Sequence, residues 1–391
     1  MFYCTTYHKI NDVPQDWNSL LNEEDFFLSK AYLKLIEEHH RNEISPLYTL
    51  VKNETEVLAI IYAQKFNFQN SKLKNYIHQE SSLFDLKTRL KTQVGKFLNV
   101  NVCFLGNLFL SNEPAFKLSS KFQLSPSEFE LILRDIQEVS DTKAILISES
   151  YEDIVDVKST KIRKISVESD MHLALNKQWS TFEDYIASLS SKYRKKYRAT
   201  EYKSRAISKK NLDLNELKSL SNDLKKLFDQ VYTRSTFNSS KFNTDTFQSL
   251  VRLTDQVCVY GYYLDKQLIG FSSLIKNKKT LYAYFVGIDY KTLIEYDLYS
   301  KMLYDKIAYA IEGRFDLIKF GRTANEFKSN FGAVQQSGNG YIFEKSGWIL
   351  FLISPFLKLL QPKPWRPRNP FKNQKGKEKL LSTNQQHSKK A

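Results

Sequence analysis

The fold is decided by residues 282–333, which read YAYFVGIDYKTLIEYDLYSKMLYDKIAYAIEGRFDLIKFGRTANEFKSNFGA. The pattern predicts a strand that carries Gly287 among large residues, a helix over 297–312, a strand over 315–321 and a short helix over 324–331. Glycine inside a strand often marks a bulge or the close approach of a ligand. Charged and phenolic side chains gather at strand ends and helix starts, which is typical of a ligand site in an open α/β sheet.

The same alternation of helices and strands continues on both sides of this stretch. Helical spacing or β-rich composition predicts helices over 22–40, 80–98, 126–139, 181–203 and 215–233, and strands over 100–110, 144–149 and 339–345. Turn residues separate two β-rich runs over 46–66 and three over 257–289, which predicts hairpins. Gly313 is predicted to follow the helix over 297–312 as its C′ residue. The chain is therefore expected to have an α/β fold built on mixed sheets.

The two halves of the chain resemble each other at a nearly constant offset. VLAIIYAQKF begins at 57 and LIGFSSLIKN at 268, an offset of 211, while VCFLGN begins at 102 and LIKFGR at 317, an offset of 215. We interpret this as a tandem duplication of one α/β unit. The predicted domains are 1–165 and 166–346, followed over 347–391 by an apolar segment and a basic tail that is largely disordered.

Composition and charge narrow the class of protein. The chain has 42% hydrophobic and 14% aromatic residues, and its mean hydropathy of −0.45 argues against a polytopic membrane protein. The net charge is +15, and two segments, 192–210 and 361–391, each carry nine Lys or Arg and one Glu. The remainder is nearly neutral, so anionic partners are expected at those two segments rather than over the whole surface.

Several kinds of chemistry are absent from the sequence. The three cysteines lie far apart and no Cys/His cluster has metal-ligand spacing, so we expect reduced thiols and no metal. None of the six histidines lies in residues 173–386, which argues against a Ser-His-Asp or Cys-His arrangement built within that half. No phosphate-binding loop of the GxxxxGK[ST] or GxGxxG type is present.

Three segments carry a family resemblance, namely YIASLSSKYRKKYRAT at 185–200, KQLIGF at 266–271 with the strand LYAYFVGID after it, and LIKFGRTANEFKSNFGA at 317–333. The second half resembles the Gcn5-related N-acyltransferase (GNAT) fold. It is most similar to the branch that contains the peptidoglycan-bridge aminoacyltransferases of the FemABX type, in which tandem copies of the fold are typical. The resemblance implies an acyltransferase whose donor lies in a V-shaped cleft between parting central strands. The first domain would then be degenerate or would orient the substrate.

The resemblance also implies roles for residues of the second half. Backbone N–H groups around Phe285, Val286 and Gly287 would polarise the donor carbonyl. The candidates for the base that deprotonates the amine are Asp289, Tyr290, Glu295 and Glu326. Donor or substrate binding is assigned to Tyr284, Tyr299, Arg322 and Lys328, and to Arg194 and Arg198 on the basic helix, since cations bind phosphate or carboxylate groups. No metal is implied.

The donor remains open between two classes. Coenzyme-A users of this fold have an Arg/Gln-x-x-Gly-x-Gly/Ala loop after the long strand, whose backbone cradles pyrophosphate. Residues 289–297 read DYKTLIEYD at that place and contain no glycine. We therefore expect no tightly bound cofactor, with either acyl-CoA or aminoacyl-tRNA as co-substrate, and nucleic acid as a partner only in the second case.

The C-terminal region points toward a membrane. WILFLISPFLKLL at 348–360 is too short to span a bilayer, and aromatic, basic and proline residues follow it to 372. Residues 348–372 are predicted to contact an anionic membrane surface, and the start of the chain shows no signal peptide. The expected function is N-acyl or N-aminoacyl transfer to a small-molecule or lipid-linked amine on a cell-envelope precursor, in the cytoplasm or on the inner face of the membrane. The alternative is a non-catalytic adaptor that binds membrane or nucleic acid.

Overall fold

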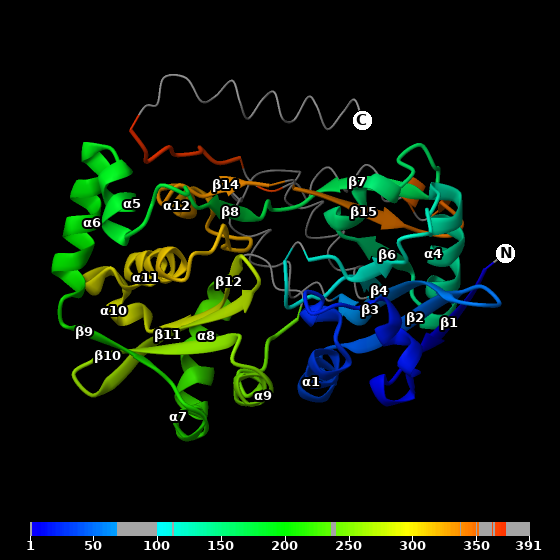
Figure 1. Cartoon of the computed structure of the whole chain (residues 1–391), viewed down its shortest axis with the longest axis horizontal. Coiled ribbons are helices and arrows are strands. Elements are labelled where there is room, and N and C mark those ends of the chain that lie inside the picture. The colour runs from blue at the N-terminus through cyan, green and yellow to red at the C-terminus, as the bar shows by residue number, and fades with distance from the viewer. Residues whose placement is uncertain are drawn as a thin grey trace, which may run out of the picture.

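The computed structural model describes residues 2–68, 100–111, 113–235, 240–336, 338–348, 350–351, 362 and 364–372. Figure 1 shows two α/β units side by side, each built on its own mixed sheet. The predicted helix over 80–98 lies outside the described residues. Among the described residues, no helix has both the length and the apolar character that crossing a membrane requires.

The N-terminal sheet has the strand order β1-β2-β3-β4-β6-β15-β7, with β5 paired to β3. Its strands are β1 (Tyr3–Tyr7), β2 (Ser45–Lys52), β3 (Val57–Phe68), β4 (Val100–Leu105), β5 (Phe116–Leu118), β6 (Ala144–Ile147), β7 (Ile162–Ser166) and β15 (Asn339–Phe343). Its helices are α1 (Lys30–His40) and α4 (Pro126–Ser140). Helix α4 begins at Ser125 because this residue and Glu128 form a reciprocal capping box.

The C-terminal sheet has the order β14-β8-β13-β12-β11-β10-β9. Its strands are β8 (Met171–Ala174), β9 (Ile207–Asn211), β10 (Val257–Leu264), β11 (Gln267–Asn277), β12 (Thr280–Ile288), β13 (Leu317–Lys319) and β14 (Val334–Gln335). Its helices are α5 (Phe182–Ser188), α6 (Ser191–Ser204), α7 (Leu214–Ser219), α8 (Ser221–Arg234), α9 (Thr246–Leu253), α10 (Tyr290–Tyr296), α11 (Leu298–Glu312) and α12 (Asn325–Ser329). Alternate residues of the sheet pack on α7–α9 on one face and on α11 on the other.

Most predicted elements are found, with local corrections. The helix expected over 22–40 begins only at Lys30, and the one expected over 215–233 is interrupted at Leu220, between α7 and α8. The single helix expected over 181–203 is broken at Leu189, whose extended backbone ends α5 before α6 begins. Gly313 was expected to take the left-handed C′ position after the long helix. In the structure Gly313 has a φ of −76°, and Arg314 after it has the left-handed φ of 53°.

The matching strand orders of the two sheets confirm the duplication. Of the two sequence alignments that indicated it, the one at an offset of 215 is wrong. The parallel pairs β4–β6 and β12–β13 stand at the same place in the two sheets. Strand β3 therefore corresponds to β11, as the offset of 211 predicts. Strand β4 corresponds to β12, so the alignment of residues 102 and 317 paired β4 with the wrong strand. The offset changes because residues 69–99 separate β3 from β4, whereas only Lys278 and Lys279 separate β11 from β12.

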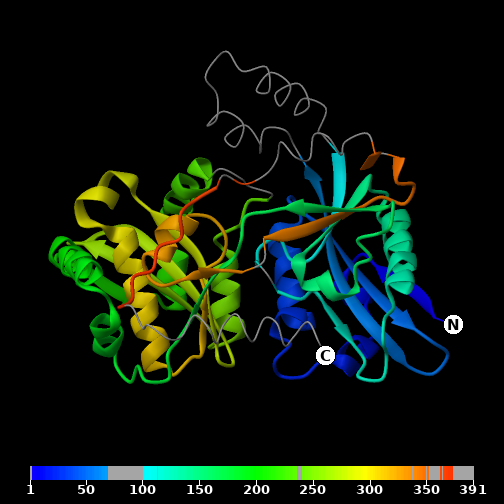
Figure 2. The same cartoon turned by 90° about the horizontal axis from the view of Figure 1, so that it is seen from above.

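The two sheets exchange their penultimate strands. Strand β8 follows β7 in the chain but lies between β13 and β14 of the C-terminal sheet. Strand β15 follows β14 but lies between β6 and β7 of the N-terminal sheet. The final strand predicted at 339–345 had been placed in the C-terminal domain, and the structure corrects this. Figure 2 shows β15, in orange, running away from its own unit into the other.

One hydrophobic core joins the two units. It contains residues of α1, β2 and β3 together with residues of α7–α9, β10 and β11. Phe242 lies at its centre, because its ring is 5.2 Å from His40 and 5.8 Å from Phe109 of the first unit and 4.1 Å from Phe285 of the second. The Phe27 and Tyr282 rings also meet across the boundary, with centroids 5.1 Å apart. The interface is therefore core-like and fixes the relative position of the sheets.

Candidate active site

A gap opens in the C-terminal sheet where its two parallel strands part. Strands β12 and β13 pair only from Thr280 with Leu317 to Tyr282 with Lys319. Beyond this point β12 continues to Ile288, while the chain after β13 turns away at Gly321. Helix α11 crosses from one strand to the other above the gap (Figure 1). Ends of parallel strands beneath a crossover helix are a common ligand-binding place in α/β folds.

A β-bulge lies on β12 beside this gap. Tyr284 and Phe285 together stand opposite Ser273 of β11, because the register shifts by one residue there. The Phe285 N–H donates to the Ser273 hydroxyl at 2.9 Å, and that hydroxyl donates to the Phe285 carbonyl at 2.9 Å. The strand bulges in the segment that the sequence indicated, but one of its backbone donors is already bonded to a side chain.

Gly287 is explained by packing on its own sheet. A Cβ at this position would lie 2.2 Å from the Phe271 ring and 2.9 Å from the backbone of Leu227. Only glycine therefore allows α8 to approach β12 so closely. Tyr284, nearby, packs its ring on Phe242 and Phe285, and its hydroxyl is buried.

The predicted base candidates lie outside the gap. The Asp289 carboxylate caps α10 by accepting the Lys291 N–H. The Tyr290 ring lies under the Arg234 guanidinium, 4.1 Å away. Glu295 is exposed on α10.

Glu326 is also exposed, and it forms an ion pair with Arg368 of the C-terminal tail. This pairing lowers the pKa of Glu326.

Two predicted cations meet at the boundary between the units. Arg322 makes a bidentate ion pair with Glu149 of the N-terminal unit, with both N–O distances 2.7 Å. Lys328 is buried and its Nζ donates to the carbonyls of Gly321 at 2.9 Å and Arg322 at 2.7 Å. Burial lowers the pKa of Lys328 to about 8, against the opposing attraction of Asp170 and Glu168.

The loop that carries these cations has an unusual backbone. Gly321, Thr323 and Ala324 all have φ between 51° and 75°. Two of the three are not glycine, so the loop holds strain of the kind that often accompanies function. Tyr299 of α11 stacks on Phe327 just after this loop, with ring centroids 5.3 Å apart.

The exchanged strand brings in two residues that sequence reasoning left out. His172 of β8 lies opposite Lys319, in the row of the sheet at which β12 and β13 part. Its Nε2 is 3.6 Å from the carboxylate of Asp170, which is fully buried and accepts a hydrogen bond from Ser111 of the other unit. The histidine argument made from the sequence counted only residues 173–386. A strand exchange could not be read from the chain order, so His172 was excluded by one residue.

The two predicted arginines of the basic helix α6 differ in their surroundings. Arg194 donates to the Leu189 carbonyl at the end of α5 and so fastens the break between the helices. Arg198 is exposed together with Lys192, Lys195 and Lys203. Within the part of the chain that the structure describes, these four make no ion pair. The helix therefore keeps a free cationic face.

A carboxylate lies at the start of α11, where a nucleotide donor would be expected. Asp297 precedes the helix and accepts hydrogen bonds from Ser300 at 2.7 Å and from Thr200 of α6 at 2.5 Å. This carboxylate binds two side-chain hydroxyls and does not cap the backbone N–H groups of α11. Its negative charge at a helix N-terminus opposes a phosphate there.

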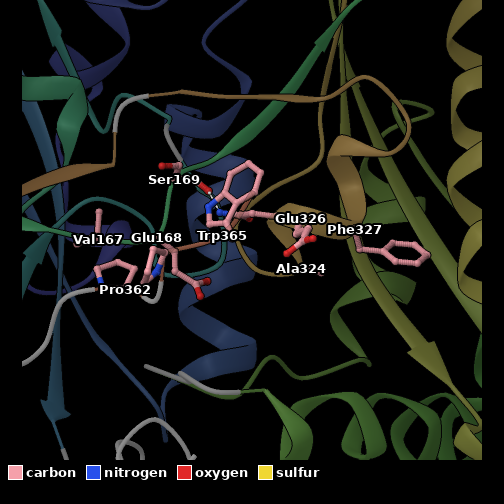
Figure 3. Close-up of a pocket in the computed structure, with 10 residues that line it drawn as sticks. Val167, Glu168, Ser169, Ala324, Glu326, Phe327, Pro362 and Trp365 are labelled. Atoms are coloured by element: carbon pink, nitrogen blue, oxygen red, sulfur yellow. Dashed lines mark hydrogen bonds between the residues drawn. The ribbon is translucent and has the colours of Figure 1, made fainter. Parts of the chain in front are cut away.

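A pocket of about 270 Å³ lies beside the boundary, between the strained loop and the C-terminal tail. Figure 3 shows Trp365 at its centre, with Glu168 and Ser169 of the crossing linker on one side and Glu326 on the other. The rest of the lining is Val167, Ala324, Asn325, Phe327, Pro362 and Pro364. Among the described residues, no set of three or more His, Cys, Asp or Glu side chains could hold a metal ion.

The comparisons with known proteins agree with this architecture. Residues 191–329 match the family described as an acetyltransferase (GNAT) domain. The crystal structure of FemX is 10% identical, covers 89% of this chain and 99% of its own, and superposes with a TM-score of 0.51. A tandem GNAT protein from the clavulanic acid biosynthesis pathway is 8% identical, covers 88% and 99%, and also has a TM-score of 0.51. No curated protein matches the chain by sequence. Residues 191–329 therefore form a domain that matches the acetyltransferase (GNAT) family, and the fold of the whole chain is similar to that of FemX and of a tandem GNAT protein.

Proposed function

We propose that this protein transfers an acyl group from an acyl thioester to a primary amine on an anionic acceptor, such as a phosphorylated or lipid-linked precursor of the cell envelope. One observation carries the proposal: β12 and β13 part within residues 191–329, the segment that matches the acetyltransferase family. A gap between parallel strands under α11 offers the acyl group a dry place beside polar groups.

The basic residues support an anionic acceptor. The exposed face of α6 carries Lys192, Lys195 and Arg198, and α6 contacts both α10 and α11. Cations without neighbouring carboxylates attract phosphate or carboxylate groups of a substrate. In this proposal, Arg322 and Lys328 hold the strained loop beside the gap. Tyr299, which stacks on Phe327, forms one wall of the gap.

Acyl-CoA is the favoured acyl donor, because it is the co-substrate of the GNAT family. Nothing in the comparisons supports aminoacyl-tRNA. However, the acidic residue Asp297 directly precedes α11 and the sequence contains no glycine loop at this place. We therefore predict weak binding of acetyl-CoA, with a dissociation constant well above 1 μM on the scale of small-ligand affinities. Titration calorimetry checks this, and submicromolar affinity would contradict it.

The proposed membrane contact rests on the apolar segment that begins at residue 348. Trp348 and Phe351 are 64% and 66% exposed, and Arg366 and Lys372 are exposed further along. We predict that the full chain sediments with vesicles that contain anionic lipid, and that replacing Trp348 and Phe351 by Ser weakens this several-fold, since apolar burial and charge attraction add. The matched control replaces the exposed Leu253, at the end of α9, by Ser. Equal sedimentation of all three proteins would remove the segment from the proposal.

The proposed activity is tested by thiol release. Purified full-length protein is incubated with a panel of acyl-CoA donors and amines, including amino sugars and lipid-linked amines, and free CoA is measured. Transfer that depends on an amine supports the proposal. Two results would overturn the proposal: thiol release that does not depend on an amine, or no thiol release with any of the donors.

The alternative of a non-catalytic adaptor has one observation in its favour. Aromatic rings fill the face of β12 beside Gly287, where Phe285 stacks on Phe242 at 4.1 Å and Tyr284 packs beside them. The opposite face of the sheet, beneath α11, contains the buried amine of Lys306 instead, and this favours the enzyme.

A further inference from the structure

Lys306 is a buried lysine that the described fold leaves without a partner. Its side chain lies on α11 and the residue is 3% exposed. It makes no hydrogen bond and no ion pair with any residue that the structure describes. A lysine is almost never buried without a partner, because desolvating an unpaired ammonium is costly. Packing alone therefore does not explain why this position is a lysine.

The position of Lys306 on its helix places it above the gap. Met302, one turn earlier, reaches Gly270 of β11, which pairs with Ile288 at the open end of β12. Ile307 and Ala310, which follow, pack with Ile318 of β13. Lys306 lies between these two contacts on the buried stripe of α11. At a rise of about 1.5 Å per helical residue, Lys306 lies about 6 Å beyond Met302 along α11. It therefore stands over the stretch of β12 between Ile288 and the last residue of β12 that pairs with β13.

The surroundings favour the neutral amine. Burial is the main cause that lowers the pKa of Lys306 to about 7, and repulsion from Lys328 of α12 adds to it. Asp305 opposes both, but its carboxylate already pairs with Lys209 and Lys301. Asp170 and Glu168 act on Lys328 rather than on Lys306. A free amine in this environment can accept a proton near neutral pH.

We propose that Lys306 is the general base that takes the proton from the acceptor amine during acyl transfer. The inference rests on the proposed function and names a residue that performs it. The amine nitrogen forms a bond to the acyl carbon, and the bond from that carbon to the thioester sulfur breaks. The proton leaves the nitrogen for Nζ of Lys306 and then neutralises the departing thiolate, so that the amide and a free thiol are the products.

The other base candidates are less well placed for this step. Asp289 caps α10, Glu326 pairs with Arg368 on the surface, and Tyr290 lies under Arg234. His172 faces Asp170 on the other side of the sheet from α11, since its neighbours Met171 and Leu173 are the ones that pack with α11. Lys306 is the candidate that combines burial, a free nitrogen and a position over the gap.

The first experiment needs no knowledge of the substrates. The folded full chain is labelled with a trace of acetic anhydride between pH 6 and pH 10, and each lysine is quantified by peptide mass spectrometry. Labelling of Lys306 is expected to be half-maximal near pH 7, well below the value of about 10.4 for a lysine in an unfolded chain. A Lys306 that follows the ordinary curve, or that the small reagent never reaches, overturns the inference.

The second experiment measures transfer with the donor and amine that react best in the thiol-release assay. Lys306→Met is expected to lower kcat about 10²- to 10⁴-fold and to remove the rise in rate that the wild type shows through pH 7. Lys266→Met is the matched control, because it removes an exposed lysine from the turn between β10 and β11 of the same unit. Normal transfer by Lys306→Met overturns this inference alone, whereas an inactive wild type overturns the proposed function and this role with it.

Discussion

At the scale of single residues, Lys306 makes the stability of the fold depend on pH. Its pKa of about 7 in the folded chain lies below the value of about 10.4 for an unfolded lysine, so the unfolded state binds more protons between these two values. The free energy of unfolding should therefore rise with pH over this window, by at most about 1.4 kcal/mol per pH unit. Below pH 7 the buried, protonated Lys306 lowers the free energy of unfolding of the wild type, and this loss is absent from Lys306→Met.

Urea unfolding at pH 7, 8 and 9 measures this effect. The wild type is expected to gain stability relative to Lys306→Met at each step, because both proteins keep every other titrating group, including Lys328. Parallel curves for the two proteins would mean that the lysine is not buried in solution as it is in the structure.

The sequence identified some of these residues and could not identify others. Arg322 and Lys328 were found because a cation after a predicted strand end is conspicuous, and both lie at the domain boundary. Lys306 was missed because a lysine within a predicted helix is usually on its exposed face. Only the packing of Met302 and Ala310 on either side shows that this helix turns its lysine inward.

At the scale of elements, the C-terminal tail fastens the joint between α5 and α6. Phe371 packs against Trp179 and Tyr185 and fills the space that Gly332 leaves open. The Ser190 N–H, at the joint, donates to the Pro370 carbonyl at 2.8 Å. The tail therefore adds a wall to the pocket and sets the start of the basic helix.

Removing the Phe371 ring tests this role of the tail. Phe371→Ala should lower the free energy of unfolding by about 1–3 kcal/mol, less than a fully buried ring would cost, and should speed hydrogen exchange at the Ser190 amide. Lys372→Ala is the control, because its exposed side chain can go while its backbone N–H still donates to Ser188. Unchanged exchange at Ser190 would show that the joint holds without the tail.

The break between α5 and α6 was beyond sequence reasoning for a related reason. Residues 181–203 keep a helical spacing of aromatic side chains, which predicts one continuous helix. Leu189 leaves the helical conformation in order to pair with Phe371 as an isolated β-bridge. The partner lies more than 180 residues away in the chain, and no local pattern reports it.

At the scale of the whole molecule, the exchanged strands and the shared core predict a single unfolding transition. Each sheet depends on a strand supplied from the far side of the other, and one hydrophobic cluster spans both units. Differential scanning calorimetry of the full chain should therefore give one cooperative peak, with calorimetric and van't Hoff enthalpies that agree. Two separated peaks would mean that the units are energetically independent.

The α/β architecture was largely predictable from the sequence, but the order of the strands in each sheet was not. Hydrophobic, β-rich runs located the longer strands of both sheets and indicated their duplication. They did not identify β1, β5, β7, β8, β9 and β14, each of which has five residues or fewer. Which strands lie side by side depends on contacts between residues such as Tyr341 and Ile147, distant in the chain. The predicted boundaries at 165 and 346 cut the chain close to where the linkers cross, and they remain a prediction about domains that share strands.

The strand exchange has a consequence for the history of the protein. After a gene duplication, one copy is free to lose its own activity, and such a copy is usually deleted in time. Here the N-terminal copy supplies β8 to the C-terminal sheet and receives β15 in return. The older half can thus drift in sequence without limit on its chemistry, yet it stays locked into the gene as an obligatory scaffold for its twin.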